Sequence, residues 1–241
     1  MRDKPLNRDA IKGIAMGTML LNHISQIFMT SGTFWAELFL DVGWFTLITM
    51  CYFLVEGYGY THDKRRYAWR LGMFAVLSQP AYILAFPEEG WYKLNILFTL
   101  LLCFFLLAAR EKIPQRGLRI AATVVIFAIS LLCDWALLAP AFTLLFAWAG
   151  RDTHKRTQAF VCAILLFGAL NLLGGIGRFT AAVNLGYALA AMSGTVLSAI
   201  AICGFYNGKR ATHGRTFAKW FFYIFYPAHL LVLGVIRLIV L

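Results

Sequence analysis

Two histidines lie inside apolar stretches of this 241-residue chain, where an imidazole is costly unless the protein uses it. His23 lies in the first stretch, eleven residues after Lys12. Eleven residues of helix rise about 16 Å and return to nearly the same face. Lys12 is therefore expected near the membrane surface, with His23 deeper on the same stripe. A neutral buried imidazole suits a general base, and the simpler alternative is an imidazole satisfied by a neighbouring helix through Asn22 or Gln26.

His229 lies in the last apolar stretch, two residues after Pro227. Proline removes a helix hydrogen bond and is expected to kink the helix there. A kink beside a histidine suits a cavity wall. A packed helix with His229 bonded to a freed carbonyl is an equal alternative.

An acidic residue near the end of the second stretch is followed by several basic ones. Glu56 precedes a turn that is followed by Arg65, Arg66 and Arg70. Arginine guanidinium groups bind phosphate oxygens well, so these side chains are candidates for holding a phosphorylated ligand. The favoured direct contact is an ion pair between Glu56 and Arg70. Any single arginine is also explained by the usual excess of basic residues in cytoplasmic loops of membrane proteins.

Three further polar residues are candidates for an outward-facing acceptor pocket: Gln79, Asn95 and Asp134. Gln79 precedes Pro80, which is expected to break the third stretch, and Asn95 opens the fourth. Taken singly, each is also explained as a loop or kink residue. No metal site is expected, because the chain has no HExxH motif and no paired Cys/His spacing. Glycine-rich phosphate loops and GxSxG motifs are also missing from the sequence, which leaves hydrolases and nucleotidases unsupported.

The composition defines the elements that must position these residues. Hydrophobic residues make up 61% of the chain, charged residues 14%, and the mean hydropathy is +0.71. Such a chain is predicted to be an all-α polytopic membrane helix bundle, with residues 1–241 forming one integral-membrane domain. About nine spans are predicted: Ile11–Met29, Val42–Tyr60, Tyr67–Phe86, Lys93–Ala109, Leu118–Cys133, Ala136–Ala149, Thr157–Gly174, Ala181–Gly204 and Phe217–Leu241.

The basic residues alternate between the two sides of this arrangement. They cluster before the first span and in the loops after the second, fourth, sixth and eighth, and only Lys93, Arg178 and Arg237 fall on the other side. The N-terminus is therefore predicted in the cytoplasm and the C-terminus outside. The net charge of +11 marks cytoplasmic loops in a bilayer rather than a nucleic-acid partner.

Several segments, in order along nearly the whole chain, resemble the TraX family of bacterial membrane acetyltransferases. They are Met-Leu-Leu-Asn-His-Ile (19–24), Phe-Leu-Val-Glu-Gly-Tyr (53–58), Arg65-Arg66-Tyr67 with Arg70-Leu71, Leu-Ser-Gln-Pro (77–80), Leu-Asn-Ile-Leu-Phe-Thr-Leu-Leu (94–101) and Phe-Tyr-Pro-Ala-His-Leu-Leu (225–231). One departure is Asn22, where the family commonly has an acidic residue before the histidine. TraX proteins look like distant relatives of the acyltransferase-3 family, whose first helix spaces a basic residue and a histidine as Lys12 and His23 are spaced here.

The resemblance implies a multi-pass acetyltransferase of the bacterial cytoplasmic membrane. Acetyl-CoA would be the co-substrate from the cytoplasm, and the acceptor would be a pilin or peptide amine, or an envelope glycan hydroxyl, presented outside. His23, with Asn22 and His229, would serve catalysis as a general base or acyl carrier. CoA is a polyanion, and its pantetheine arm, roughly 15 Å extended, matches the rise from Lys12 to His23.

Two other functions are compatible with the same residues. A transporter or proton relay would use His23, Glu56 and His229. A non-catalytic assembly factor of an envelope machine would need none of them. The oligomeric state is not readable from the sequence.

Overall fold

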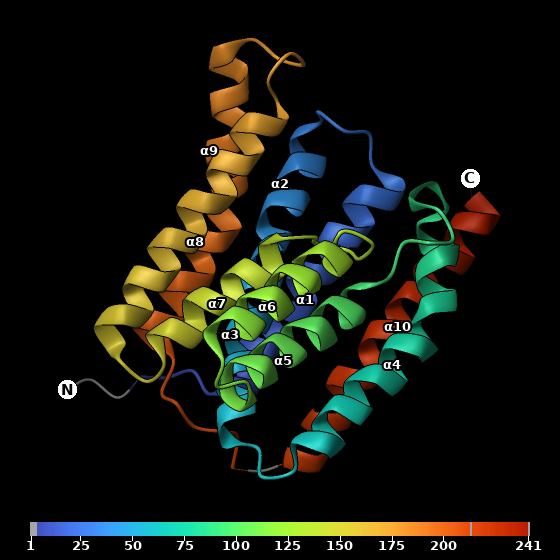
Figure 1. The fold of residues 1–241 in the computed structure, drawn as a ribbon. Helices are drawn as coiled ribbons and strands as arrows, with labels where there is room; N and C mark the ends of the chain where they lie inside the picture. The colour runs from blue at the N-terminus through green and yellow to red at the C-terminus, as the bar shows by residue number, and fades with distance from the viewer. Residues whose placement is uncertain (1–3, 213, 241) are drawn as a thin grey trace. The chain divides into compact units, whose positions relative to one another are not determined.

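The computed structural model describes residues 4–212 and 214–240, with the side chains of residues 215–219 outside that description. Arg2 of the predicted basic N-terminus, His213 and Leu241, the end of the last predicted span, lie outside the described residues, as do the basic side chains of Arg215 and Lys219. The helices in chain order are α1 (Arg8–Phe28), α2 (Phe34–Gly43), α3 (Phe45–Tyr60), α4 (Lys64–Ala85), the 3₁₀-helix η1 (Pro87–Glu89), α5 (Ile96–Lys112), α6 (Arg116–Ser130), α7 (Leu138–Ala149), α8 (Thr153–Gly174), α9 (Ala181–Ala199), the π-helix η2 (Ile200–Phe205) and α10 (Arg215–Val240) (Figure 1).

The predicted all-α membrane protein is confirmed at this level. Among the described residues, four helical segments are long and apolar enough to cross a membrane: Phe34–Tyr60, Thr153–Gly174, Ala181–Phe205 and Trp220–Val240. Two of them are interrupted, since α2 and α3 share one segment and α9 continues into η2.

Two local predictions were wrong. The second apolar segment begins as helix at Phe34 rather than at Val42, because the run from Phe34 to Leu40 is itself mostly apolar and helical. Pro80 does not break the third segment, since α4 runs through it to Ala85.

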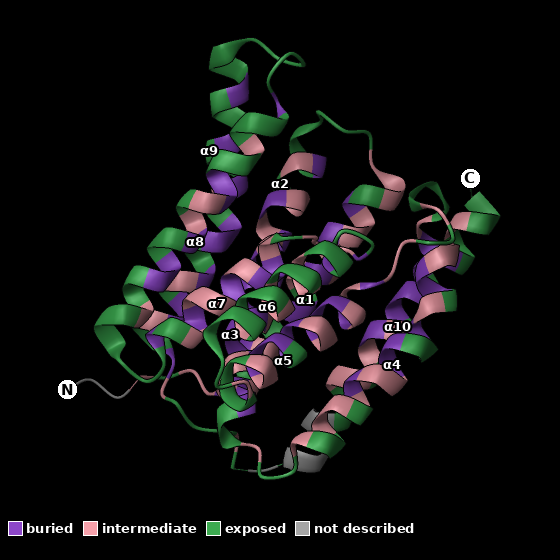
Figure 2. Cartoon of the chain, viewed as in Figure 1, coloured by how far each residue is buried: buried purple, intermediate pink, exposed green. Residues whose placement is uncertain are grey.

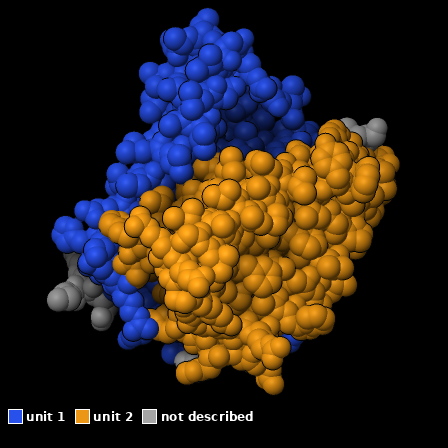
Figure 3. All heavy atoms as spheres, in the orientation of Figure 1, with its two compact units in different colours: residues 1–50, 151–222 blue, residues 51–150, 223–241 orange. Residues whose placement is uncertain are grey.

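The chain forms two compact units (Figure 3). Unit 1 contains residues 1–50 and 151–222, and unit 2 contains residues 51–150 and 223–241. Helices α3 and α10 each contribute residues to both units.

In unit 1, α2 packs against α1 and α9, and α9 packs against α8 and η2 (Figure 1). The N-terminal segment pairs with the chain that follows η2. Leu6 donates its N–H to the Phe205 carbonyl and accepts from the Asn207 N–H, and Lys4 Nζ donates to the Cys203 carbonyl at 2.6 Å. The lysine and the Leu6 N–H thereby satisfy carbonyls that the end of a helix leaves without partners.

In unit 2, α5 packs against α4, α6 and α7. Its core consists of large buried side chains, including Leu106, Phe142 and Phe146, and buried residues line the facing sides of these helices (Figure 2). Phe74 of α4 stacks on Tyr223 of α10 with ring centroids 4.9 Å apart.

Polar side chains cap the N-termini of several helices, at positions where the sequence changes from a loop to an apolar run. Asn7 accepts from the Ala10 N–H, Asp63 from the Arg66 N–H, Asn95 from the Leu97 N–H and Asp152 from the N–H groups of His154 and Lys155. These caps satisfy N–H groups that have no partner within the helix.

Candidate functional site

Lys12 and His23 both lie on the unbroken helix α1, as the predicted stripe requires. Both side chains are half-buried, and the buried Met16 and Met19 lie between them along the helix. Lys12 Nζ lies 5.1 Å from the centroid of the Phe222 ring, within range of a cation–π interaction. The half-burial of Lys12 and His23 is consistent with the amphipathic stripe that the spacing predicts.

Asn22, next to His23, is buried and binds the break between α2 and α3. The helix is interrupted at Trp44, whose N–H turns to the Asp41 carbonyl instead of Leu40. The Leu40 carbonyl is thereby released from the helix, and Asn22 Nδ2 donates to it at 2.9 Å. Asn22 Oδ1 in turn accepts from Gln26 Nε2. In the hydrocarbon region a released carbonyl needs a donor, and the Asn22 amide supplies one.

Two glycines let neighbouring helices approach this break closely. A Cβ on Gly43 would lie 2.2 Å from Asn22 Cβ, and a Cβ on Gly194 of α9 would lie 2.1 Å from the Asp41 carbonyl oxygen. Neither distance is tolerable for carbon. The break is thus enclosed by α1 on one side and α9 on the other.

A ladder of polar contacts follows the same face of α1. Ser25 Oγ donates to the Ala36 carbonyl at 2.7 Å, and Thr46 Oγ1 donates to the Ala15 carbonyl at 2.6 Å. Thr18 and Thr46 share a hydrogen bond of 3.0 Å. Together with Asn22, these contacts fix the rotation of α1 about its axis and so fix where His23 lies.

His229 of α10 is buried, and its ring is held by the helix on which it lies. Its Nδ1 lies 2.8 Å from the Phe225 carbonyl oxygen. A carbonyl only accepts, so Nδ1 carries the hydrogen and Nε2 is the basic nitrogen. The ring also stacks on Phe225, with centroids 4.9 Å apart. The sequence alternative was a bond to the carbonyl that Pro227 frees, which is that of Tyr223. His229 binds the Phe225 carbonyl instead, in its own helix turn, and in this neutral form Nε2 has no hydrogen.

Gln79 and Asn95 bind each other in unit 2. Gln79 Oε1 accepts from Asn95 Nδ2 at 2.8 Å and from the Asn95 N–H at 3.1 Å, while Gln79 Nε2 donates to the Lys93 carbonyl at 2.7 Å. Asn95, fully buried, also donates to the Ala75 carbonyl at 2.8 Å. The two amides fasten the start of α5 to α4 beside Pro80.

Asp134 lies in the same part of unit 2. The Leu94 N–H donates to the Leu132 carbonyl, and the Asp134 N–H donates to the Leu94 carbonyl at 2.7 Å. Because Leu94 adjoins Asn95, the three residues predicted to face an acceptor are brought together by short backbone contacts. Their role toward a substrate stays a prediction.

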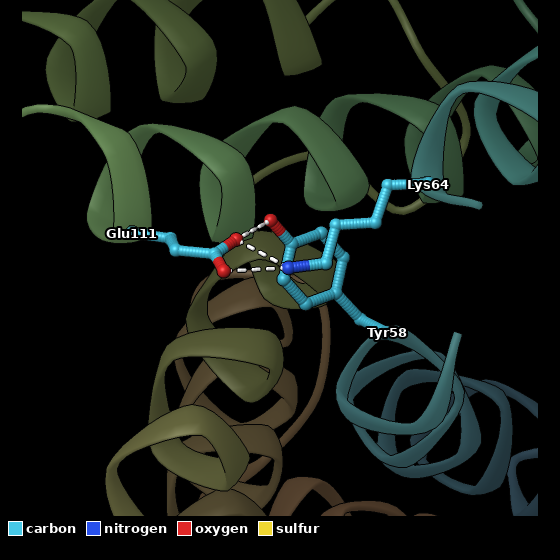
Figure 4. Close-up of polar contacts among 3 residues, drawn as sticks. All are labelled: Tyr58, Lys64 and Glu111. Atoms are coloured by element: carbon cyan, nitrogen blue, oxygen red, sulfur yellow. Dashed lines mark hydrogen bonds and ion pairs between the residues drawn. The ribbon is translucent and has the colours of Figure 1, made fainter. Parts of the chain in front are cut away.

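A cluster that the sequence did not reveal joins α3, α4 and α5 (Figure 4). Lys64 Nζ lies 2.6 Å from both oxygens of Glu111 and 4.3 Å from the Tyr58 ring centroid, and the Tyr58 hydroxyl donates to Glu111. The hydrogen bonds from Lys64 and then Tyr58 hold the pKa of Glu111 below its usual value. The cluster holds the first residue of α4 against α3 and α5. Of its three residues, only Tyr58 lies in a segment that the sequence analysis singled out, Glu-Gly-Tyr.

The predicted phosphate-binding residues lie around that cluster. Arg65 is exposed, and Arg66 Nε pairs with Asp63 at 3.0 Å while its side chain remains 82% exposed. Arg70 lies over the Tyr67 ring at 5.8 Å and donates to the Tyr223 hydroxyl. Glu56 is half-buried on α3. Arg65 and Arg66 are thus accessible to an anion, whereas Arg70 is engaged with aromatic side chains.

Among the described residues, no group of three or more His, Cys, Asp or Glu side chains is arranged to hold a metal ion. Residues that the sequence did not single out include Tyr82 and Tyr226, which interact electrostatically with Asp134. Tyr226 adjoins Pro227 and lies in the Phe-Tyr-Pro-Ala-His segment. That segment could therefore have pointed to Tyr226 as well as to His229.

Comparison with known proteins gives the family. The model of the family described as "TraX protein" matches residues 7–237. This chain belongs to the TraX family. It is 32% identical over 232 residues to the "Probable fimbrial assembly protein FimC, serogroup H1" of Dichelobacter nodosus, covering 92% of each chain. It is 28% identical over 247 residues to "Protein TraX" of Escherichia coli, covering 97% of this chain and 88% of that protein. No solved structure matches.

Proposed function

We propose that this TraX-family protein is a membrane-bound acetyltransferase. It takes an acetyl group from cytoplasmic acetyl-CoA and transfers it to an amine or hydroxyl on the outer side of the bacterial cytoplasmic membrane. The acceptor class is a pilin or fimbrial subunit, or an envelope glycan. The printed name of the Dichelobacter relative, a fimbrial assembly protein, favours the subunit.

The observation that carries the proposal is the state of His229. Its Nδ1–H is donated to the Phe225 carbonyl, so Nε2 is a hydrogen-bond acceptor in a buried, apolar setting beside Pro227. A general base must present such a nitrogen to the proton that it removes.

The proposal assigns the remaining residues by their chemistry. His23 is the second imidazole, acting as general base or acyl carrier, and Asn22 holds the helix on which it lies. Lys12, Arg65, Arg66 and Arg70 are assigned to the phosphates of CoA, with Glu56 orienting the basic groups. Asp134 is assigned to the acceptor, and Gln79 and Asn95, whose amides bind each other, are assigned to positioning the start of α5 beside it. A distant relationship to the acyltransferase-3 family, expressed in the Lys12–His23 spacing, is part of the same proposal.

The proposed topology has nine spans, with the N-terminus in the cytoplasm and the C-terminus outside. Its support is the alternation of basic residues together with the order of the helices. When α2–α3 and α9–η2 are each taken as one interrupted segment, and the short η1 is set aside, the described residues contain nine helical segments. Cysteine labelling of single-cysteine variants from either side of sealed vesicles tests this order.

The enzymatic test uses the purified full chain in lipid vesicles with labelled acetyl-CoA and peptide-amine or glycan acceptors. His229→Asn keeps a donor for the Phe225 carbonyl but removes the basic Nε2. We expect a folded protein, somewhat less stable because the ring stacking on Phe225 is lost, with a loss of transfer on the order of a hundredfold or more. His23→Ala tests the second imidazole, and His154→Ala, at an exposed position in the first turn of α8, is the control. Equal turnover by wild type and both variants contradicts the assignment.

A second candidate is a non-catalytic assembly factor of a surface fibre, which the name of the Dichelobacter relative also favours. It differs in its response to the same variants. If cells that carry His23→Ala or His229→Asn assemble surface fibres as the wild type does, that result supports the assembly factor over the enzyme.

A further inference from the structure

Three helices of unit 2 are short for a protein that crosses a membrane. α5 has 17 residues, α6 has 15 and α7 has 12, whereas α4 beside them has 22. At about 1.5 Å per residue, α6 rises about 22 Å and α7 about 18 Å. The hydrocarbon layer of a bilayer is about 30 Å thick. Neither α6 nor α7 reaches across it, and any tilt shortens the reach further.

Basic residues mark the end at which α6 and α7 enter the bilayer. Arg116 and Arg119 lie in the first turn of α6, and Arg151 follows α7. Arg110 and Lys112 lie in the last turn of α5. Both ends of the α6–α7 pair are therefore on the basic side, which the proposed topology places in the cytoplasm. The turn between α6 and α7 points toward the opposite side.

Contacts with the start of α5 fix the depth of that turn. Leu94 lies just before α5, at the end remote from the basic residues. Its N–H donates to the Leu132 carbonyl at 2.9 Å, and its carbonyl accepts the Asp134 N–H at 2.7 Å. Thr99, in the first turn of α5, donates its hydroxyl to the Asp134 carbonyl at 2.6 Å. The α6–α7 turn is thus level with the first turn of α5.

Helices α4 and α10 extend past this level. Gln79 of α4 binds Asn95 at 2.8 Å, and α4 continues to Ala85, about 9 Å farther along its axis. A Cβ on Gly234 of α10 would lie 2.8 Å from the Leu84 side chain, so α10 packs closely against this last part of α4. The α6–α7 turn and the start of α5 are therefore set back from the outer ends of α4 and α10.

The residues of the turn suit a hydrocarbon environment. Turns in water are usually built of Gly, Pro, Asn, Asp and Ser. In this turn Leu131, Leu132 and Leu137 are 56%, 55% and 44% exposed. Large apolar residues are kept even at Trp135 and Leu137, whose φ values of 58° and 63° glycine adopts more easily. Exposed apolar surface of this kind is better covered by acyl chains than by water.

Backbone groups of the turn find their partners within the protein. The N–H groups of Leu131, Leu132 and Cys133 donate to carbonyls at the end of α6. The Leu137 N–H donates to Ser130 Oγ at 3.1 Å. Irregular backbone at membrane depth is tolerated only where protein or a water-filled cavity satisfies its polar groups. These hydrogen bonds, with the two from Leu94, supply that satisfaction without water.

We propose that the α6–α7 turn and the start of α5 lie inside the outer leaflet, where lipid acyl chains cover Leu131, Leu132 and Leu137. The proposed order of nine segments is kept, because both ends of the α6–α7 pair remain on one side. The consequence for acetyl transfer rests on the proposed function. The acetyl group would cross about 20 Å of unit 2 instead of about 30 Å of bilayer, and the CoA arm of roughly 15 Å covers most of that distance.

The first test measures the depth of the turn in lipid vesicles with spin labels. Cys162→Ser and Cys203→Ser remove the two cysteines that are not buried, and the three buried ones are retained. A nitroxide is then attached at Leu131→Cys or Leu132→Cys in the full chain. We expect both labels to collide more often with oxygen, which concentrates in hydrocarbon, than with a water-soluble nickel chelate.

Two positions outside the proposed hydrocarbon region are the matched controls. Gln115→Cys lies in the exposed connection between α5 and α6, and Glu88→Cys lies in η1, where the Glu88 side chain is 73% exposed. Labels at both controls are expected to favour the nickel chelate. If the labels at Leu131→Cys and Leu132→Cys favour the chelate as strongly as the label at Glu88→Cys, the turn lies in water and the proposal is overturned.

The second test uses a charge and needs no label. Leu132→Glu is expected to lower the unfolding temperature in vesicles by several degrees, because a carboxylate among acyl chains is costly. Gln115→Glu is the control and is expected to unfold at the wild-type temperature. An unchanged unfolding temperature for Leu132→Glu contradicts the lipid cover. Neither test uses acetyl transfer, so if both succeed in vesicles that transfer no acetyl group, the proposed function fails and the position of the turn stands.

Discussion

Asn22 gives the sharpest test of how unit 1 is built. Its Nδ2 donates to the Leu40 carbonyl at 2.9 Å, and that carbonyl is released from the helix because the Trp44 N–H turns to Asp41. Asn22→Asp replaces the donor with an oxygen that, when ionised, only accepts. The change therefore sets two acceptors against each other at a position that is 6% exposed.

The expected cost comes from the broken hydrogen bond to the Leu40 carbonyl. Leaving a buried acceptor unsatisfied costs about 1–3 kcal/mol, and the carboxylate adds a desolvation penalty unless it takes up a proton. Asn22→Leu removes the donor without adding charge and should cost about 1–3 kcal/mol alone. Asn22→Asp is expected to be the less stable of the two, because a buried carboxylate must either stay charged without water or take up a proton. Gln26→Ala is the control, because Gln26 is exposed and its removal leaves the bond to Leu40 intact.

The assay is thermal unfolding of the purified chain in detergent, followed by monodispersity, alongside acetyl transfer on the same samples. Unfolding of both Asn22→Asp and Asn22→Leu at the wild-type temperature would refute the role given to the Asn22 amide. Full stability with a gain of activity in Asn22→Asp would refute it as well, since the residue would then act through His23 rather than through the helix break.

Three further perturbations test the remaining contacts. Asn95→Ala removes the α5 cap and the donor to Ala75, and should cost about 2–4 kcal/mol in unfolding free energy, with Gln79→Leu nearly as costly. The lowered pKa of Glu111 means that its contribution to stability is present above 4.5 and is lost as the pH falls through the folded-state value, so Glu111→Gln should lower the unfolding temperature near neutral pH and flatten its decline in acid. Gly194→Ala meets backbone at 2.1 Å and should destabilise strongly in thermal unfolding, while Gly186→Ala, on the same helix with open space around it, should be neutral or stabilising by up to about 1 kcal/mol.

The helical class and most helix positions could be predicted because apolar runs and caps are local properties of the sequence. Asn95 opens α5 as predicted, since its side chain caps the first turn. The break at Trp44 could not be predicted, because the sequence from Phe34 to Tyr60 is mostly apolar and contains no proline. Its position depends on Asn22 and Gly194, which come from distant parts of the chain.

The glycines of α1 show the same dependence on distant parts of the chain. Gly13 and Gly17 form a GxxxG pattern, which permits close packing of another helix. In the described structure no neighbouring helix comes within 4 Å of the place where a Cβ on either glycine would lie, whereas Gly43 and Gly194 are closely approached. Glycine spacing shows where a helix surface lacks side chains. Whether another helix packs closely there depends on the neighbouring helices.

The polar residues inside the apolar segments divide according to what the backbone requires of them. A carbonyl at a helix break or beside a proline must find a donor in the absence of water. Asn22 meets that need at Leu40. Asn95 donates to the Ala75 carbonyl near Pro80, next to the Val76 carbonyl that the proline leaves without its helix donor. Their amides are therefore committed to structure, and a role in chemistry would have to be indirect.

His229 and Asp134 differ from these amides. One ring nitrogen of His229 binds a carbonyl while the other remains basic. The carboxylate of Asp134 accepts the Trp135 N–H in a turn where Trp135 and Leu137 have positive φ, and it repairs no helix break. These two titratable side chains are therefore stronger candidates for direct chemistry than the two amides.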